Sequence, residues 1–388
     1  MLYNLFLDKW SLHWFQFILD NPDKKWNHSL LSSNKNINID IIKSNKNINW
    51  DYQYLSTNSS IKLNDVKDNP SLDWNYYFLS SHPKITWDFV NIFYDKKFDY
   101  YILSGNKTVT LEIIKTNPNR QWSYSILTNN PNITFDIIKS NPKIKWNYDD
   151  LSSNKNITWE DVITNPDIRW NYDKLGMNPN ITWEIIQSNP QIKWNYDNIS
   201  INPNITWENV ITNPDKKWNY LLLFIYNNKI NIEHIKAYPD KDWKYANISN
   251  NSKITWEIVS TLPDKQWSYM YLSMNHNITW NIVISNPDKP WSYTHLSVNP
   301  NITFDIIKSN PDKNWSYAYL SLNPNISFND IKSNSDKNWS FPDLSKNTFE
   351  KERNNFIRKE YQKFFMKNIA EELISVVWHP KNIHRFVV

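Results

Sequence analysis

Large aromatic side chains return at every 24th position along most of this chain. Starting from Trp26, thirteen of fourteen such positions hold Trp and one holds Phe, with one extra residue inserted before the tenth. The positions are Trp26, Trp50, Trp74, Phe98, Trp122, Trp146, Trp170, Trp194, Trp218, Trp243, Trp267, Trp291, Trp315 and Trp339. A period of this size, held in register over about 300 residues, is typical of repeat proteins. The sequence therefore predicts one array of similar units.

Each unit has two halves with the same internal order, as residues 179–202 show. In both halves an apolar residue precedes a capping residue, an aromatic follows, and the half ends near Asn-Pro. Thr182 and Asn195 carry short side-chain oxygens that can accept from the free N–H groups of a helix's first turn. Ile181 and Ile186 have the spacing of a hydrophobic staple. Because Pro disfavours α geometry in the residue before it, each Asn-Pro is expected to end a helix of about two turns.

The rival interpretation is a β-solenoid, because Thr, Trp, Ile, Val and Tyr also favour strands. The adjacent pair Ile185-Ile186 breaks the alternation that a half-buried strand requires. Two Gly in 388 residues are also too few for tight coils that turn repeatedly. We therefore predict an all-α fold: an α-solenoid (superhelix) of about 14 repeats, each with two short helices, α or 3₁₀, per 24 residues.

The two ends of the chain depart from the repeat. Residues 1–20 are rich in aromatics and out of consensus, which predicts an N-terminal cap, and the repeat array then covers residues 21–341. From Thr348 to Val377 apolar residues recur at spacings of three and four, which indicates a long amphipathic helix closing the last repeat. We assign residues 342–388 to this C-terminal capping helix and a basic tail.

Composition excludes many kinds of active site. With only two Gly, no glycine-rich phosphate loop can be written. With no Cys there is no disulfide framework, thiolate zinc site, iron–sulfur cluster or cysteine nucleophile. We expect no cofactor.

Histidines and acidic residues do not form a catalytic or metal pattern. The eight His fall at different phases of the repeat, and His379 and His384 have no further ligands nearby to complete a metal site. The acidic residues recur in most repeats, as structural residues do, and no nucleophile elbow is present. We expect no catalytic residue and no metal site, and interpret the protein as a non-enzyme.

Charge and hydropathy say little about location. The net charge of +4 is too small for a dedicated nucleic-acid footprint, and no apolar run approaches the about 18 residues of a membrane span. The first residues lack the features of a signal peptide. We expect a soluble, intracellular protein with no membrane span.

The Trp array has two possible roles. Aromatics interleaved with Lys can stack on the bases of single-stranded nucleic acid. Here the Trp positions coincide with staple and first-turn sites, and they barely vary along the array, whereas residues that recognise a partner should vary. We therefore interpret the Trp side chains as core.

The most informative departure from the repeat lies at residues 221–226. Here the usual Ser-x-Asn-Pro ending is replaced by an apolar run, and the one-residue insertion follows before Trp243. This run is either a longer, buried helix or an exposed apolar patch that binds a partner. As candidate partner-binding residues we take Leu221, Leu222, Leu223, Phe224, Ile225 and Tyr226. Capping residues are missing at Lys62 and Lys244.

Two resemblances follow from these motifs. Asn178-Pro179-Asn180-Ile181-Thr182 and Asn213-Pro214-Asp215 resemble the leucine-rich repeat variant, an α-solenoid that alternates α and 3₁₀ helices. The iron–sulfur cluster of that family has no counterpart in a chain without Cys. The segments 202–207 and 286–291, and the ending 372–380, are more similar to Asn-Pro/Trp repeat arrays of giant DNA viruses. This likeness implies a viral protein, in the host cytoplasm or the virion.

Three hypotheses of function remain. The first is a non-catalytic scaffold that presents an extended concave surface to protein partners. The second is a nucleic-acid-binding solenoid that uses the basic C-terminal tail and exposed aromatics. The third is an enzyme with a site at residues 221–235, where Glu233 and His234 would act.

Overall fold

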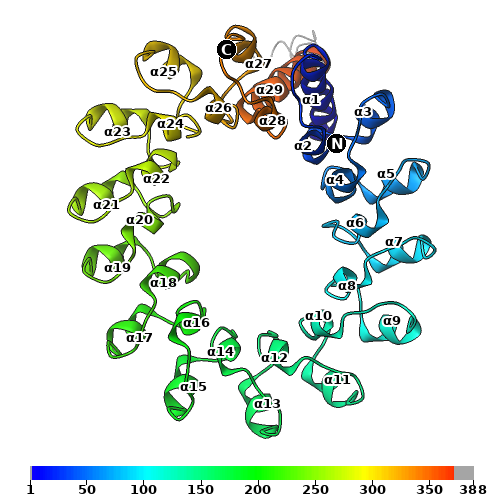
Figure 1. Ribbon diagram of the computed structural model, residues 1–388, viewed down its shortest axis with the longest axis vertical. Helices are drawn as coiled ribbons and strands as arrows, with labels where there is room; N and C mark the ends of the chain where they lie inside the picture. Colours follow the sequence, from blue (N-terminus) through cyan, green and yellow to red (C-terminus); the bar gives the residue numbers. More distant parts are fainter. Residues whose placement is uncertain (1, 371–388) are drawn as a thin grey trace, which may run out of the picture. The chain divides into compact units, whose positions relative to one another are not determined.

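The computed structural model describes residues 2–370. This part of the chain is helical and contains no β-strand (Figure 1). The predicted all-α solenoid, with two short helices per repeat and a long helix near the C-terminus, is confirmed. Both halves of the repeat form α-helices, and within residues 2–370 no 3₁₀ helix of the kind implied by the leucine-rich repeat variant occurs.

The helices fall into two alternating sets. The first-half helices are α3 (Ile39–Ser44), α5 (Leu63–Asp68), α7 (Trp87–Ile92), α9 (Leu111–Thr116), α11 (Phe135–Lys139), α13 (Trp159–Thr164), α15 (Trp183–Ser188), α17 (Trp207–Ile211), α19 (Ile232–Ala237), α21 (Trp256–Thr261), α23 (Trp280–Ser285), α25 (Phe304–Ser309) and α27 (Phe328–Lys332). The second-half helices are α2 (His28–Ser33), α4 (Tyr52–Thr57), α6 (Tyr76–Leu79), α8 (Tyr100–Leu103), α10 (Tyr124–Thr128), α12 (Tyr148–Leu151), α14 (Tyr172–Leu175), α16 (Tyr196–Ser200), α18 (Tyr220–Tyr226), α20 (Tyr245–Ile248), α22 (Tyr269–Met274), α24 (Tyr293–Leu296), α26 (Tyr317–Leu320) and α28 (Phe341–Leu344). The array is flanked by α1 (Leu2–Leu19) and by α29 (Glu350–Phe365), which continues as a π-helix over Met366–Ala370.

The described chain divides into two compact units. Unit 1 combines residues 2–73 with residues 293–370, and unit 2 consists of residues 74–292. Within unit 2 the second-half helices form a row along the concave side, and the first-half helices form the row behind them (Figure 1). The predicted division into an N-terminal cap (1–20), a repeat array (21–341) and a C-terminal segment (342–388) concerns the role of each segment. The two compact units do not test it, and it stays a prediction.

Most helix starts follow the capping pattern, although Thr255 and Thr303 make no side-chain cap bond. The Thr182 side chain accepts from the N–H of Ile185, and the Asn195 side chain accepts from the N–H groups of Asp197 and Asn198. Lys62 and Lys244, the two positions without a capping residue, make no side-chain cap bond. Lys244 has a left-handed conformation, with φ of 55°, which is uncommon for a residue other than Gly.

The Asn-Pro and Trp motifs are joined by two hydrogen bonds. Asn189 Nδ2 donates to the carbonyl of Ile185 at 2.7 Å and so satisfies an orphan acceptor at the end of α15. The indole N–H of Trp194 then donates to the carbonyl of Asn189 at 3.2 Å. The same indole bond, to the residue five earlier, is present from Trp26 to Trp339 in twelve repeats. Trp is thus favoured over Phe because this position needs a donor as well as a large ring.

The aromatic array is buried between successive repeats. Eleven of its fourteen rings are at most 8% exposed, while Trp26, Trp122 and Trp315 are half-buried. Trp218 shows the arrangement: its ring meets Tyr196 edge to face at 5.2 Å and Trp183 at 5.5 Å, both from the preceding repeat. Because each ring is shared with a neighbouring repeat, stacking supplies the burial that one repeat lacks. The core interpretation of the array Trp side chains agrees with these positions.

A column of buried asparagines links each repeat to the one before it. Asn202 Nδ2 lies 2.8 Å from the carbonyl oxygen of Gly176, 3.1 Å from that of Asn178 and 3.0 Å from that of Ile181. Its Oδ1 accepts from the N–H of Asn204 at 2.8 Å. Equivalent amide bonds to the preceding repeat are made by Asn58, the half-buried Asn106, Asn130, Asn154, Asn178, Asn227, Asn275, Asn323 and Asn347. These residues form the asparagine column.

A column of hydroxyls runs beside the asparagines. Ser200 Oγ donates to the carbonyl of Tyr196 and accepts from the N–H of Asn219, which caps the next second-half helix, at 3.0 Å. Ser152, Ser249 and Ser297 accept in the same way from residues nineteen positions on. The polar groups of the inter-repeat joint are therefore satisfied by side chains of fixed type.

In unit 1 the first repeat occupies the position of a repeat that would follow the last one. The N–H of Asn27 donates to Ser345 Oγ at 3.0 Å, and Asn34 Nδ2 donates to the carbonyls of Ser345 and Asn347 at 2.9 and 3.2 Å. The hydroxyl and asparagine columns make the same bonds between successive repeats, but here the bonded residues lie more than 300 positions apart. We call this joint the seam.

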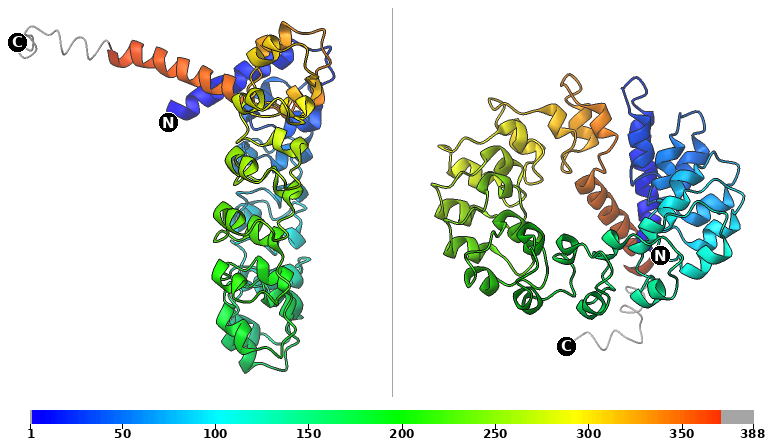
Figure 2. Two further views of the ribbon diagram at one scale, coloured as in Figure 1. Left: turned by 90° about the vertical axis from the view of Figure 1, so that its left-hand side faces the viewer. Right: turned by 60° about the horizontal axis from the view of Figure 1, so that its bottom comes forward.

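Helices α1 and α29 pack against each other beside the seam (Figure 2). Phe6 of α1 meets Tyr361 of α29 edge to face at 4.8 Å, and Phe17 of α1 stacks on Phe328 of α27 with ring centroids 4.4 Å apart. The predicted C-terminal helix begins at Glu350 rather than Thr348, and its predicted part beyond residue 370 lies outside the described residues.

Replacing Asn202 with Ala should destabilise the array locally, because it removes the donor to the carbonyl of Gly176 and one of two donors to the carbonyls of Asn178 and Ile181. We expect a loss of about 3 kcal/mol, since each unsatisfied buried group costs roughly 1–3 kcal/mol. The matched control is Asn204→Ala, a half-buried Asn two residues on, for which we expect about 1 kcal/mol. Urea titration followed by circular dichroism and Trp fluorescence measures both losses. Equal losses would contradict the central role of the column.

Candidate interaction surface

Two positions in each second-half helix vary, while their neighbours are nearly constant. The preceding residue is almost always Tyr and the following one is Leu or Ile, yet α8 has Tyr101 and Ile102 at these positions and α14 has Asp173 and Lys174. In unit 2 these variable pairs are residues 77–78, 101–102, 125–126, 149–150, 173–174, 197–198, 221–222, 246–247 and 270–271. We call them together the variable face; none of these side chains is buried in the described structure.

The structure explains why these pairs can vary. The Leu or Ile after each pair is fully buried, for example Leu175 and Ile199, both 0% exposed. The Ser and Asn further on carry the two hydrogen-bonded columns. The variable pairs are thus the part of each second-half helix that does not take part in the repeated joint.

One end of the variable face is aromatic. Tyr77 on α6 is 53% exposed and Tyr101 on α8 is 59% exposed, with Ile102 beside it at 38%. Tyr124, the constant Tyr of α10, is also exposed. Exposed rings on neighbouring helices are the kind of surface that becomes buried in protein–protein contacts.

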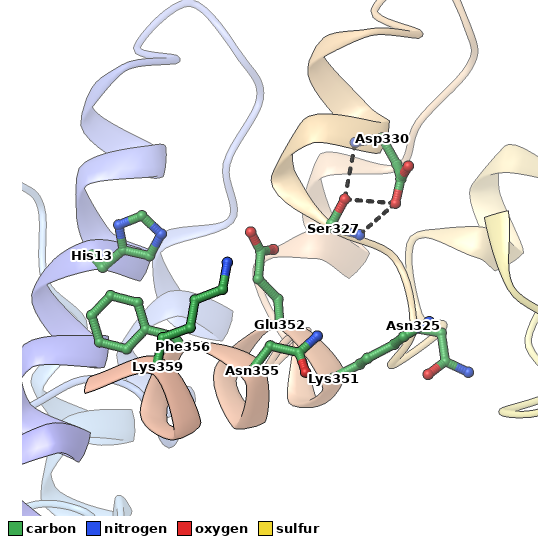
Figure 3. A pocket seen from close by; sticks show the side chains of 9 residues that line it. All are labelled: His13, Asn325, Ser327, Asp330, Lys351, Glu352, Asn355, Phe356 and Lys359. Atoms are coloured by element: carbon green, nitrogen blue, oxygen red, sulfur yellow. Dashed lines mark hydrogen bonds between the residues drawn. The ribbon is translucent and has the colours of Figure 1, made fainter. Parts of the chain in front are cut away.

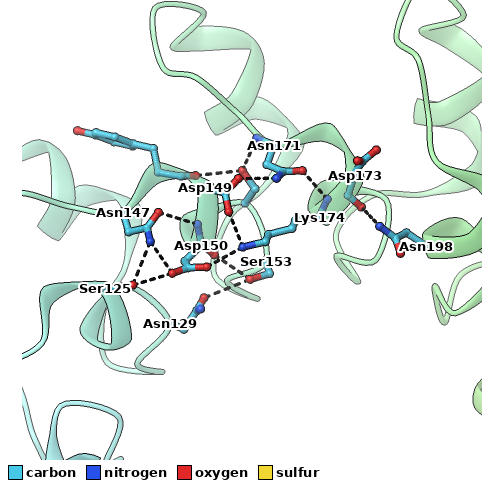
Figure 4. A network of polar contacts seen from close by, with 12 residues as sticks. Ser125, Asn129, Asn147, Asp149, Asp150, Ser153, Asn171, Asp173, Lys174 and Asn198 are labelled. Atoms are coloured by element: carbon cyan, nitrogen blue, oxygen red, sulfur yellow. Dashed lines mark hydrogen bonds and ion pairs between the residues drawn. The ribbon is translucent and has the colours of Figure 1, made fainter. Parts of the chain in front are cut away.

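The middle of the variable face is acidic, and ion pairs and hydrogen bonds connect its side chains between neighbouring repeats (Figure 4). Lys174 Nζ lies 2.6 Å from both Asp149 and Asp150 of the preceding repeat. A hydrogen bond from Asn171 and the Lys174 ammonium lower the pKa of Asp149, and Lys174 likewise lowers the pKa of Asp150. Asp173 and Asp197 continue the acidic stretch and are exposed.

The predicted partner-binding run at residues 221–226 forms α18, the longest second-half helix. Leu223 and Phe224 are fully buried. Leu221, Leu222 and Ile225 are half-buried, and Tyr226 is 63% exposed. Leu221 and Leu222 are a variable pair, so part of the predicted set lies on the variable face; whether this set binds a partner stays a prediction.

The repeat that contains α18 contacts the next repeat through different hydrogen bonds from those of the other repeats. Phe224 stands where the hydroxyl column has Ser, so no side chain there can accept from the N–H of Lys244. Lys253 Nζ instead donates to the carbonyls of Phe224 at 2.8 Å and Ile230 at 3.1 Å, and desolvation lowers its pKa. Tyr245 donates to the carbonyl of Pro239 at 2.8 Å, and burial raises its pKa to about 12.

A polar cavity of about 390 Å³ lies in unit 1 between α1, α27 and α29 (Figure 3). His13 packs on Phe356, with ring centroids 5.0 Å apart, and burial lowers its pKa. Glu352 Oε2 accepts from the N–H of Phe328 at 2.9 Å and so caps α27, while burial raises the pKa of this carboxyl. Lys359 projects into the same space.

The residues proposed for the enzyme hypothesis have structural roles. His234 Nδ1 accepts from the N–H of Asn231 at 3.0 Å, and its ring lies 4.9 Å from that of Trp207. Glu233 pairs with Lys236 at 3.3 Å. Within residues 2–370 no three His, Cys, Asp or Glu side chains come together as metal ligands would.

The basic tail with His379 and His384 lies outside the described residues. In the part that is described, no helix combines the length and the apolar character needed to cross a bilayer. Comparison of the chain with family models, with curated proteins and with solved structures finds no match. The surface of this chain itself therefore provides the indications of function.

The sequence contained the signal for the variable face but not for the cavity or the seam. The face could have been found by aligning the repeats and asking which positions vary. The cavity joins His13 to residues more than 300 positions away, and the repeat pattern does not indicate that pairing.

Acid should weaken the fold through His13. A folded-state pKa below the ordinary value means that the unfolded chain binds the proton more readily, so stability falls as pH drops below about 6.5. We expect His13→Gln to show a smaller fall in urea midpoint than the wild type between about pH 7.5 and about pH 5.5.

The solvent-exposed His28→Gln is the matched control and should behave as the wild type. Glu352, with its raised pKa, contributes with the opposite sign in both proteins, so the difference between them reports His13. An unchanged pH profile in His13→Gln would rule out this role.

Proposed function

We propose that this chain is a non-catalytic repeat scaffold that binds a protein partner along the variable face of unit 2. The observation that carries the proposal is that each second-half helix, on the concave side of unit 2, varies at one pair of exposed or half-buried residues between nearly constant neighbours. Repeat proteins commonly use such extended surfaces for binding. An intracellular, viral setting is consistent with the likeness to giant-virus arrays, and stays part of the proposal.

The chemistry of the face indicates the partner. Exposed rings at Tyr77 and Tyr101 favour a partner with apolar or aromatic side chains. Asp149, Asp150 and Asp173 carry three negative charges against the one positive charge of Lys174. A partner segment with Lys or Arg beside apolar anchors therefore complements the face best.

A nucleic-acid ligand is the second candidate, since exposed Tyr rings can stack on bases. The acidic middle of the face opposes a phosphate backbone. Binding to single-stranded oligonucleotides that falls steeply with salt would favour this candidate; a protein complex that survives moderate salt favours the first.

Charge and apolar variants of the face test the proposal. The partner is first recovered by cross-linking to the full-length chain in its native cells, and its affinity is then measured by titration calorimetry. We expect Tyr101→Asp and Asp173→Lys each to weaken binding about tenfold or more. The control is Ile163→Asp, because Ile163 is 57% exposed but lies on the first-half helix α13. Equal loss in all three variants would contradict a role for the variable face.

Helix α18 offers a second comparison. Leu222→Asp changes a half-buried side chain of the face and should weaken partner binding while the fold persists. Phe224→Asp places a charge at a fully buried site and should cost several kcal/mol of stability. Calorimetry with the partner and urea titration separate the two effects. If Leu222→Asp binds normally, α18 is not part of the interface.

A further inference from the structure

The seam repeats the hydrogen bonds of consecutive repeats without a covalent connection. At an ordinary joint, Asn58 Nδ2 donates to the carbonyls of Ser32 and Asn34 at 2.9 and 3.0 Å. At the seam, Asn34 Nδ2 donates to the carbonyls of Ser345 and Asn347 at 2.9 and 3.2 Å. The first repeat therefore lies on the last one in the register of a next repeat.

The rings at the seam follow the same pattern. Trp26 meets Phe341 edge to face at 5.1 Å and 90°. Trp218 meets Tyr196, the equivalent residue of an ordinary joint, at 5.2 Å and 87°. The seam is thus an ordinary joint in both its polar and its apolar contacts.

Opening the seam leaves polar groups that few partners can satisfy. The buried amide of Asn34 would lose its acceptors, and the carbonyls of Ser345 and Asn347 would lose their donor. Leaving such groups buried and unpaired is costly. The chemical surface that restores every bond in register is the corresponding end of another copy of this chain.

The ion pairs beside the seam do not lock it, whereas the aromatic contacts of the buried α1 rings, such as Phe17 on Phe328 and Phe6 on Tyr361, must separate when it opens. Lys9 pairs with Glu360 at 2.9 Å and Lys332 with Asp20 at 3.7 Å. Ion pairs that are partly exposed contribute little to stability. The seam therefore depends on its hydrogen bonds and on the packing of α1, and a second copy of the chain offers the same groups for both.

We propose that the seam is an exchangeable interface, in which the first repeat and α1 of one copy stack on the last repeat and α29 of a second copy. The partner at this surface is a second copy of the chain, and the exchange is a domain swap. Two copies that exchange ends reciprocally keep every seam bond that each makes alone. This inference is independent of the proposed function, since the variable pairs used there lie in unit 2.

The Lys9–Glu360 pair provides a direct test, because a zero-length carbodiimide joins an amine to a carboxylate in contact. Two differently tagged full-length copies are co-expressed, one with Lys9→Ala and the other with Glu360→Gln. Both also carry Lys363→Ala, since Lys363 competes for Glu360 at 2.9 Å. Neither copy can form the 9–360 link within itself, so a linked product of twice the chain mass, with the 9–360 peptide identified by mass spectrometry, is expected.

The chain with Lys363→Ala alone is the control and should form the 9–360 link within one molecule. If this control links and the co-expressed pair does not, the exchange proposal is wrong. If the control does not link, the seam itself is absent and the proposal is also wrong.

Seam variants supply a second, kinetic readout. When separately folded copies are mixed, we expect Asn34→Ala in both copies to speed the appearance of the linked dimer, because it weakens the joint that must open. Asn202→Ala removes an equivalent bond set from the interior of the array and should leave this rate unchanged. Equal rates in the two variants would contradict opening at the seam.

Discussion

The fold depends on how the backbone carbonyls at the end of each second-half helix are satisfied. A solenoid of helices this short leaves many such groups free, because each helix has orphan acceptors at its end and few turns in which to use them. The side-chain NH₂ of the buried Asn202 donates to carbonyls of the preceding repeat. The side-chain oxygen of the same residue accepts from the backbone N–H of Asn204. The register between repeats is therefore set by side-chain amides as well as by apolar packing.

The indole bonds extend the same logic within a repeat. Trp194 fills the space between helices and returns its N–H to the carbonyl of Asn189, whose side chain has already capped α15. Few other residue types could meet these demands together. The framework is accordingly almost invariant, and two outward positions per second-half helix can vary without disturbing it.

Most of the architecture was accessible from the sequence because it is local. Caps such as Thr182, the Asn-Pro stops and the burial of Trp218 all follow from the repeat pattern and from elementary helix chemistry. The role of the buried Asn202 was not predicted, since an Asn before Pro was interpreted through the Pro alone. The difference lies in bonds that reach back 21 to 26 residues, which a reading of local helix signals does not include.

The seam and its cavity were less accessible. Nothing in the local pattern around Asn27 or Ser345 indicates that they meet, because the repeat signal describes neighbours in sequence and these residues lie 318 positions apart. Similarly, residues 221–226 could be recognised as irregular from sequence, but only packing shows that Leu223 and Phe224 are buried while Tyr226 is exposed.

The asparagine column has a consequence for chemical ageing. Deamidation begins when the following backbone nitrogen attacks the side-chain carboxamide, and it would replace a donor with an anion facing carbonyl oxygens. At Asn130, Asn178 and Asn202 the next residue is Pro, which has no N–H to react, and no Gly follows any Asn of the column. At these Asn-Pro joints the sequence therefore blocks this route of covalent damage to an Asn-rich protein.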